Sequence, residues 1–261
     1  MNAGLREALS PYRHACGGLK VRINGEACVL RCSGALWVVE HRVLIASDLH
    51  LEKGSAFAAR GQMLPPYDSP ATIAKLEAEV EALDPKTVVL LGDSFHDSKA
   101  ISRMTASDGA RLAAMARERT WIWLEGNHDL KALAGALDTL TGQVVTTLEV
   151  GGLRLIHEPQ PGEHKGEVAG HLHPCATVVA YARGVRRPCF VTDGCRAILP
   201  AFGAFTGGLD VRDPAIADLF REPPMVAVLG RDQVHAVAWS RLGQISTAHP
   251  AYVLSRKPPR L

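Results

Sequence analysis

The chain has 261 residues, with 29 Lys and Arg against 27 Asp and Glu, and 47% of its residues are hydrophobic. This hydrophobic content, together with 21% charged residues, excludes a disordered chain. The net charge of +2 is much smaller than the positive charge of a dedicated nucleic-acid-binding domain. No apolar run approaches the roughly 20 residues of a membrane helix, and residues 1–18 lack the apolar core of a secretory signal. We therefore expect one soluble, cytoplasmic domain over residues 1–261, with no membrane contact and with six reduced cysteines of no assigned function.

The first half of the chain predicts strands that alternate with helices. Four short strands are expected at 19–23, 27–31, 36–39 and 43–46. A helix over 69–83 has Asp68 or Ser69 as its cap and Pro70 in its first turn. The apolar run TVVLL at 87–91 is typical of a strand that is buried on both faces. A second helix over 106–119 and a strand over 121–124 follow.

The second half predicts strands with little helix between them. They are expected at 144–150, 154–156, 177–182, 189–192, 225–229 and 234–239. The first half thus supplies β–α–β crossovers and the second supplies hairpins. Two sheets packed face to face, with helices outside, would accommodate both patterns.

Five short motifs follow predicted strands, where ligands of open α/β sheets gather. They are Asp48-Leu49-His50, Gly92-Asp93, Gly126-Asn127-His128-Asp129, His157 and Gly170-His171-Leu172-His173. Each motif alone is common as a turn or a helix cap, but all five at strand ends indicate a shared site. Carboxylate, imidazole and amide side chains bind Mn, Fe, Zn or Mg. His157 is favoured over His164 as a ligand because it follows a strand, and a ligand needs a rigid support.

This ordered set resembles the calcineurin-like metallophosphoesterase superfamily. The resemblance implies an α/β fold, a four-layer α/β/β/α sandwich of two mixed sheets flanked by helices, and a dinuclear metal site with Mn as the favoured ion and Fe, Zn or Mg as alternatives. It implies one ion held by Asp48, His50, Asp93 and His173, and a second held by Asp93, Asn127, His157 and His171. Asp93 would bridge the two ions, which activate a bridging hydroxide for in-line attack at phosphorus. His128, outside this ligand set, would protonate the leaving oxygen, and Asp129 would fix its tautomer.

Longer segments are similar to the PdeM family of bacterial DNA ligase-associated metallophosphoesterases. They are LEKGSAFAARGQMLPPYDS (51–69), LGDSFHDS (91–98), AGHLHP (169–174) and PAFGAFTGGL (200–209). This similarity implies an endonuclease of DNA repair that acts on DNA beside an ATP-dependent DNA ligase, a helicase and an exonuclease.

Four further residues are candidates for substrate contact: Arg60, His96, Arg186 and Arg187. Arg60 and His96 follow ligand motifs, with a packed loop as the alternative. Arg186 and Arg187 belong with Arg183 to a local basic cluster, with a solvated loop as the alternative.

Two other functions stay open. A hydrolase of small phosphodiesters or nucleotide pyrophosphates is favoured by the near-zero net charge. A non-catalytic scaffold of the same fold is the third interpretation, and the intact Gly126-Asn127-His128-Asp129 motif argues against it.

Overall fold

The computed structural model describes residues 12–62, 64–65, 67–127, 141–180 and 183–243, and among them seven strands form a first sheet. In spatial order these are β1 (Leu19–Ile23), β2 (Glu26–Leu30), β3 (Leu36–Val38), β4 (Val43–Ala46), β5 (Thr87–Leu91), β6 (Thr120–Leu124) and β7 (Gln143–Val145). The strands from β1 to β4 are antiparallel, and those from β4 to β7 are parallel. The parallel part brings the carboxyl ends of β4, β5 and β6 to one edge of the sheet.

A second sheet comprises eight strands of the described chain. They are β8 (Leu148–Val150), β9 (Leu153–Leu155), β10 (Glu167–Ala169), β11 (Cys175–Ala180), β12 (Arg183–Thr192), β13 (Ala197–Ile198), β14 (Met225–Leu229) and β15 (Val234–Val237). The spatial order is β15-β14-β12-β13-β10-β9-β8, and β11 pairs with β12. Strand β10 runs parallel to β9 and β13, so this sheet is also mixed.

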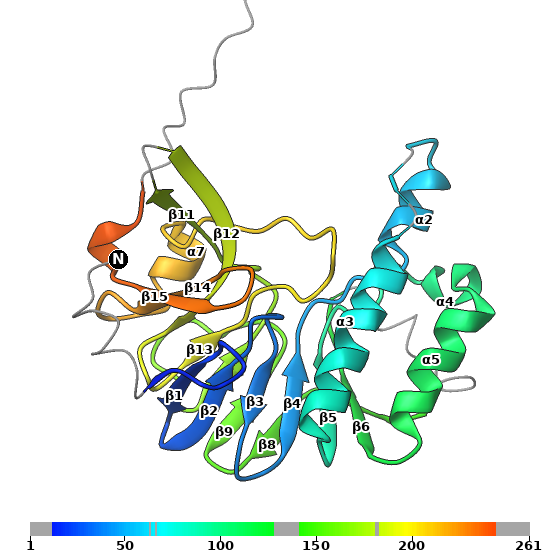
Figure 1. Cartoon of the computed structure of the whole chain (residues 1–261), viewed down its shortest axis with the longest axis horizontal. Helices are drawn as coiled ribbons and strands as arrows, with labels where there is room; N and C mark the ends of the chain where they lie inside the picture. Colours follow the sequence, from blue (N-terminus) through cyan, green and yellow to red (C-terminus); the bar gives the residue numbers. More distant parts are fainter. Residues whose placement is uncertain (1–11, 63, 66, 128–140, 181–182, 244–261) are drawn as a thin grey trace, which may run out of the picture.

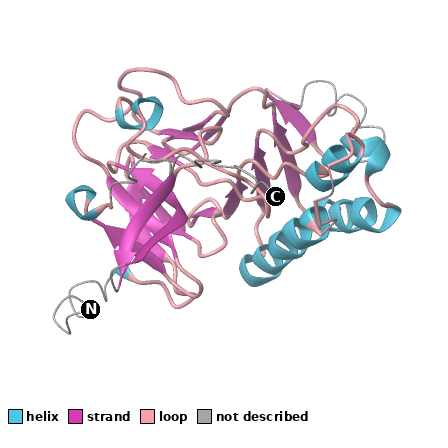
Figure 2. Cartoon of the chain, turned by 90° about the horizontal axis from the view of Figure 1, so that it is seen from above, coloured by secondary structure: helices cyan, strands magenta, loops and turns pink. Residues whose placement is uncertain are grey.

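The helices are α2 (Lys53–Ala58), α3 (Asp68–Leu83), α4 (Ala100–Arg103), α5 (Ala106–Ala116), α7 (Pro214–Ala217) and the 3-10 helix η2 (Trp239–Arg241). Figure 1 shows α3 and α5 along the outer face of the first sheet, and Figure 2 shows the same arrangement from above. Among the described residues, no helix is long and apolar enough to cross a lipid bilayer.

Three apolar clusters define four layers. Ile73 of α3 and Leu112 of α5 pack with the outer face of the first sheet. Ile45 and Phe190 belong to the core between the sheets, and Ile216 of α7 packs on the outer face of the second sheet. The predicted four-layer α/β/β/α sandwich is therefore confirmed, with a thin outer layer on the second sheet.

Strand β5 is apolar at every buried position because both of its faces are covered. Val88 and Leu90 face the helices, whereas Val89 and Leu91 face the second sheet. Successive side chains of a strand point to opposite faces, so a strand covered on both sides is apolar throughout. The prediction that residues 87–91 are buried on both faces is confirmed.

The single strand predicted at 144–150 is wrong. It is divided into β7 in the first sheet and β8 in the second, and Thr146 and Thr147 carry the chain between them. A run of β-branched residues favours extended backbone but does not show which sheet it joins. The predicted helix over 106–119 ends at Ala116, because the chain turns before β6 begins at Thr120.

The interpretation of the basic cluster as a solvated loop is wrong. Arg186 and Arg187 lie in β12, which begins at Arg183, and not in a solvated loop. The pairing of β12 with β11 extends the strand beyond the segment predicted at 189–192.

Candidate metal centre

The side chains singled out by the motifs follow their strands at a nearly constant distance. Asp48, Asp93, His157 and His171 each lie two residues after the end of a strand, namely β4, β5, β9 and β10. Asn127 lies three residues after β6. The carboxyl ends of strands from both sheets therefore place these side chains at one edge of the sandwich.

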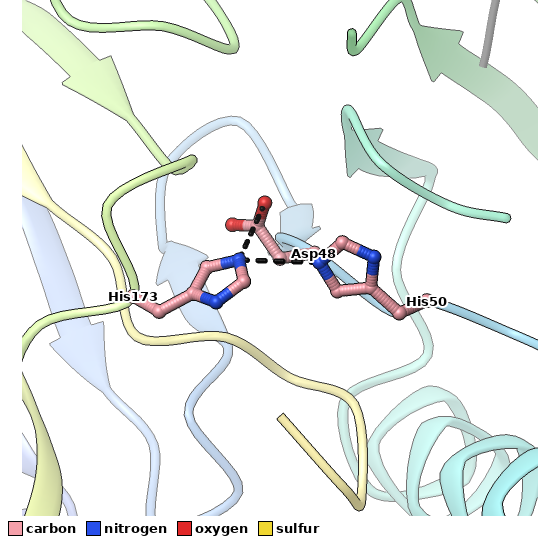
Figure 3. Close-up of side chains that lie close together, drawn as sticks. All are labelled: Asp48, His50 and His173. Atoms are coloured by element: carbon pink, nitrogen blue, oxygen red, sulfur yellow. Dashed lines mark hydrogen bonds and ion pairs between the residues drawn. The ribbon is translucent and has the colours of Figure 1, made fainter. Parts of the chain in front are cut away.

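A first cluster consists of Asp48, His50 and His173, whose ligand atoms lie within 4.8 Å of one another. Nε2 of His173 is 3.1 Å from Oδ1 of Asp48 and 3.2 Å from Nε2 of His50. Figure 3 shows the side chain of His173 meeting those of Asp48 and His50, which come from a single segment far away in the sequence. Asp48 is fully buried, so its carboxylate has little contact with solvent.

A second cluster consists of Asp93, His157 and His171, also within 4.8 Å. Nε2 of His157 lies 3.5 Å from Oδ1 of Asp93 and 3.2 Å from Nδ1 of His171. Nδ2 of Asn127 lies 3.4 Å from the same Nδ1, so the exposed Asn127 borders this cluster.

Asp93 lies between the two clusters. Its Oδ1 faces His157, and its Oδ2 is 4.0 Å from Nε2 of His50. On the other side, Nδ1 of His157 is 3.9 Å from Oδ1 of Asp48. One carboxylate thus presents a different oxygen to each cluster.

The geometry of the first cluster fits a cation. Nδ1 of His173 lies 3.2 Å from the carbonyl of Gly207, which can only accept a hydrogen bond, so this contact favours the tautomer with its proton on Nδ1 and a lone pair on Nε2. That lone pair faces Oδ1 of Asp48, a buried oxygen that accepts no hydrogen bond within the described part of the chain. Two nitrogens bound to one ion at about 2.1 Å each are themselves about 3 Å apart, which matches the pair formed by His50 and His173.

Groups around the clusters fix the orientation of the ligands. Ser47 Oγ (2.6 Å) and the backbone N–H of His171 (3.0 Å) donate to Oδ2 of Asp48, which leaves Oδ1 for the cluster. Nδ1 of His157 donates to the Leu91 carbonyl at 3.2 Å, so Nε2 points at Asp93. Ser47 was not among the predicted site residues, although its place directly before Asp48 is a signal for this contact.

Five residues of the clusters adopt the left-handed backbone region. Their φ angles are 55° for Asp48, 45° for His50, 46° for Asp93, 64° for His171 and 46° for His173. Such strain costs of order 1–3 kcal/mol per residue and gathers at functional sites. The strand ends also approach closely, because a Cβ on Gly126 would lie 2.1 Å from the backbone nitrogen of Asp93. A glycine is therefore required before Asn127.

The two buried histidines have opposite pKa shifts. Burial lowers the pKa of His50 to about 4, against the smaller opposing effect of Asp48. Burial also acts to lower the pKa of His157, but its hydrogen bond to Asp93 and the charges of Asp48 and Asp93 raise it to about 9. A positive charge is thus favoured beside Asp93 when no metal is bound.

The other predicted residues lie at different distances from the clusters. The ring of His96 is 6.1 Å from that of His50, whereas Arg60 is exposed beyond the end of α2. Arg186 and Arg187 are exposed on β12. His128 and Asp129 lie outside the described residues.

One protein family and several solved structures are similar to this chain. Residues 41–192 match the family described as calcineurin-like phosphoesterase. The nuclease MPE of Pseudomonas putida is 28% identical, with a TM-score of 0.67, over 84% of this chain and 100% of its own. The E. coli phosphoesterase YfcE is 18% identical, with a TM-score of 0.37, over 76% of this chain and 92% of its own. No functionally curated protein matches the sequence.

Proposed function

Because the chain belongs to the calcineurin-like phosphoesterase family and is a metal-dependent phosphoesterase, we propose that it is a two-metal phosphodiesterase that cleaves DNA. The observation that carries this proposal is the pair of adjacent clusters that share Asp93. The nuclease activity in the name of the Pseudomonas putida neighbour supports a nucleic-acid phosphodiester as the substrate.

The ligands divide between two ions, for which we propose Mn²⁺. Asp48, His50 and His173 hold one ion; Asn127, His157 and His171 hold the other; and Asp93 offers an oxygen to each. A carboxylate between two cations offsets their repulsion. The mixed nitrogen and oxygen donors suit Mn²⁺ and also admit Fe, Zn or Mg.

When bound, two divalent ions lower the pKa of water and offset the charge that develops on phosphoryl oxygens. The chain's own groups hold these ligands in place: Ser47 orients Asp48, and the carbonyls of Leu91 and Gly207 orient His157 and His173.

In this proposal His128 protonates the leaving oxygen and Asp129 orients His128. Both assignments rest on the Gly126-Asn127-His128-Asp129 motif. His96 and Arg60 are proposed to contact the substrate around the clusters, and Arg187 is proposed to contact DNA beyond them. Action in DNA repair beside an ATP-dependent ligase, a helicase and an exonuclease stays a prediction of the sequence resemblance, as does the cytoplasmic location.

The test is a parallel assay of the Mn²⁺-loaded protein on single-stranded DNA, duplex DNA, bis-p-nitrophenyl phosphate and a nucleotide pyrophosphate. We expect DNA cleavage that disappears in Asp93→Asn. Hydrolysis of the nucleotide pyrophosphate without DNA cleavage would instead establish a small-molecule phosphohydrolase. Binding of both metals without hydrolysis of any substrate would indicate a scaffold.

A further inference from the structure

A segment after β13, residues 202–209, connects the two sides of the first cluster, and we call it the strap. At its start, the N–H groups of Phe202 and Gly203 donate to the carbonyls of Ser47 (2.7 Å) and Asp48 (3.1 Å). Towards its end, the carbonyl of Gly207 accepts the Nδ1–H of His173 at 3.2 Å. The strap therefore touches the backbone of one proposed ligand and the side chain of another.

Helix α3 holds the start of the strap. Nζ of Lys75 donates to the carbonyl of Phe202, and the N–H of Ala204 donates to Oγ1 of Thr72 at 3.0 Å. These contacts fix the half of the strap that lies against Asp48.

The end of the strap is held from the second sheet. Nη2 of Arg186 donates to the carbonyl of Gly208, and the N–H of Cys175 donates to the carbonyl of Leu209 at 2.8 Å. The strap lies directly on the ligand here, because a Cβ on Gly208 would be 1.9 Å from the carbonyl oxygen of His173. A shift of Gly208 would therefore displace the neighbouring carbonyl that orients His173.

Arg187 cannot contact the strap as Arg186 does. Strand β12 pairs Arg186 with Thr177 and Arg187 with Ala176 of β11, and successive side chains of a strand point to opposite faces. Arg186 projects towards the strap, and Arg187 projects away from it.

We propose that Arg186 is a positioning residue for the metal ligand His173. By holding the Gly208 carbonyl, it keeps the Gly207 carbonyl against Nδ1 of His173, and this contact leaves Nε2 for the cation. The inference rests on the proposed metal centre, and it separates Arg186 from the DNA contacts with which the sequence had grouped it. Loss of an outer-shell partner commonly weakens metal binding by about 10–100-fold, and the contact from Arg186 is one step further away, so we expect roughly tenfold.

The test compares Arg186→Gln, Arg186→Lys and Arg187→Gln. Mn²⁺ is titrated into each metal-free protein, and bound ion is measured by calorimetry and by loss of the free Mn²⁺ signal in electron paramagnetic resonance. Hydrolysis of bis-p-nitrophenyl phosphate is followed against Mn²⁺ concentration, and DNA cleavage is measured at saturating Mn²⁺.

We expect Arg186→Gln to bind one of its two ions about tenfold more weakly and to recover its turnover of the small diester at saturating Mn²⁺. Arg186→Lys should recover part of the affinity, because an ammonium group can also donate to the Gly208 carbonyl; it also carries the test if the Gln variant does not fold. Arg187→Gln should keep the Mn²⁺ affinity of the unsubstituted protein.

Unchanged Mn²⁺ affinity in Arg186→Gln, with or without weaker DNA cleavage, would overturn the positioning role. Failure of the unsubstituted protein to bind two ions would instead overturn the metal centre itself, so the two failures are distinguishable.

Discussion

Raising the pH from 6.5 to 8.5 should strengthen Mn²⁺ binding about 100-fold, because His157 must lose a proton before its Nε2 can bind a cation. In the metal-free protein the pKa of His157 is raised to about 9 by Asp93 and Asp48, which outweigh the opposing effect of burial. The neutral fraction of this ring therefore grows about tenfold per pH unit below pH 9. At about 1.4 kcal/mol per unit, the two units correspond to roughly 3 kcal/mol of binding free energy. His50, with a pKa lowered to about 4, is already neutral over this range and adds nothing.

The metal-free protein should show the opposite trend in stability. The pKa of His157 is raised above its unfolded value of 6.5, so its contribution to the free energy of unfolding is complete below pH 6.5 and is lost as the pH rises through 9. The pKa of His50 is lowered to about 4, so its contribution is present above pH 6.5 and is lost as the pH falls to 4. These two groups together favour a stability maximum near pH 6.5.

Two measurements report the proton on His157. Calorimetric titration with Mn²⁺ in buffers of different ionisation enthalpy should show about one proton released per chain near pH 7. Thermal unfolding with a chelator should give a melting temperature that falls above pH 6.5, and His157→Gln should remove that fall. Equal Mn²⁺ affinity at pH 6.5 and 8.5, without proton release, would show that Mn²⁺ does not displace a proton from His157.

Two substitutions test neighbouring parts of the site. His128→Ala should keep both metals but lower DNA cleavage by about 10²–10⁴-fold. Its loss of activity on bis-p-nitrophenyl phosphate should be smaller, because that leaving group needs little protonation. Metal release, or equal loss on both substrates, would contradict the acid role. Gly126→Ala should displace Asp93, since the new Cβ would lie 2.1 Å from its backbone nitrogen, and should lower the unfolding free energy by about 1–3 kcal/mol and the metal content with it. The control is Gly109→Ala in helix α5, where the nearest atom is 4.0 Å from the new Cβ. This substitution should leave the stability unchanged or raise it. Equal stability and metal content in the two variants would show that the space around Gly126 does not require a glycine.

The sequence predicted which side chains would gather at the site because each follows a strand. Parallel strands such as β4 and β5 end at the same edge, so residues two positions further on, such as Asp48 and Asp93, meet across the sheet. Contacts made through backbone carbonyls were not predictable. The contact between Gly207 and His173 depends on the course of the strap, which no residue pattern encodes.

Long elements were predicted better than short ones. The apolar run of β5 and the spacing of apolar residues in α3 are local signals, and both elements appear within a residue of the expected bounds. The predicted cap of α3 at Asp68 or Ser69 is wrong, because the N-cap residue is Tyr67 and no side chain accepts a hydrogen bond there. Asp68 and Ser69 contact Gly54 and Glu52 instead. Strand β10 has three residues, too few for any period to show, and α2 begins after Glu52 in a left-handed conformation without a side-chain cap. Such elements form because neighbouring strands and helices hold them.

In our proposal the two clusters form one metal centre joined through Asp93. Elemental analysis of the Mn²⁺-loaded protein, after removal of free metal, tests it most directly, with Asp93→Ala measured beside the unsubstituted chain and folding verified by circular dichroism. We expect close to two ions per unsubstituted chain and loss of both in the folded variant, because Oδ1 and Oδ2 of Asp93 face different clusters. One ion retained at full occupancy in Asp93→Ala would contradict it, since the clusters would then bind their metals independently.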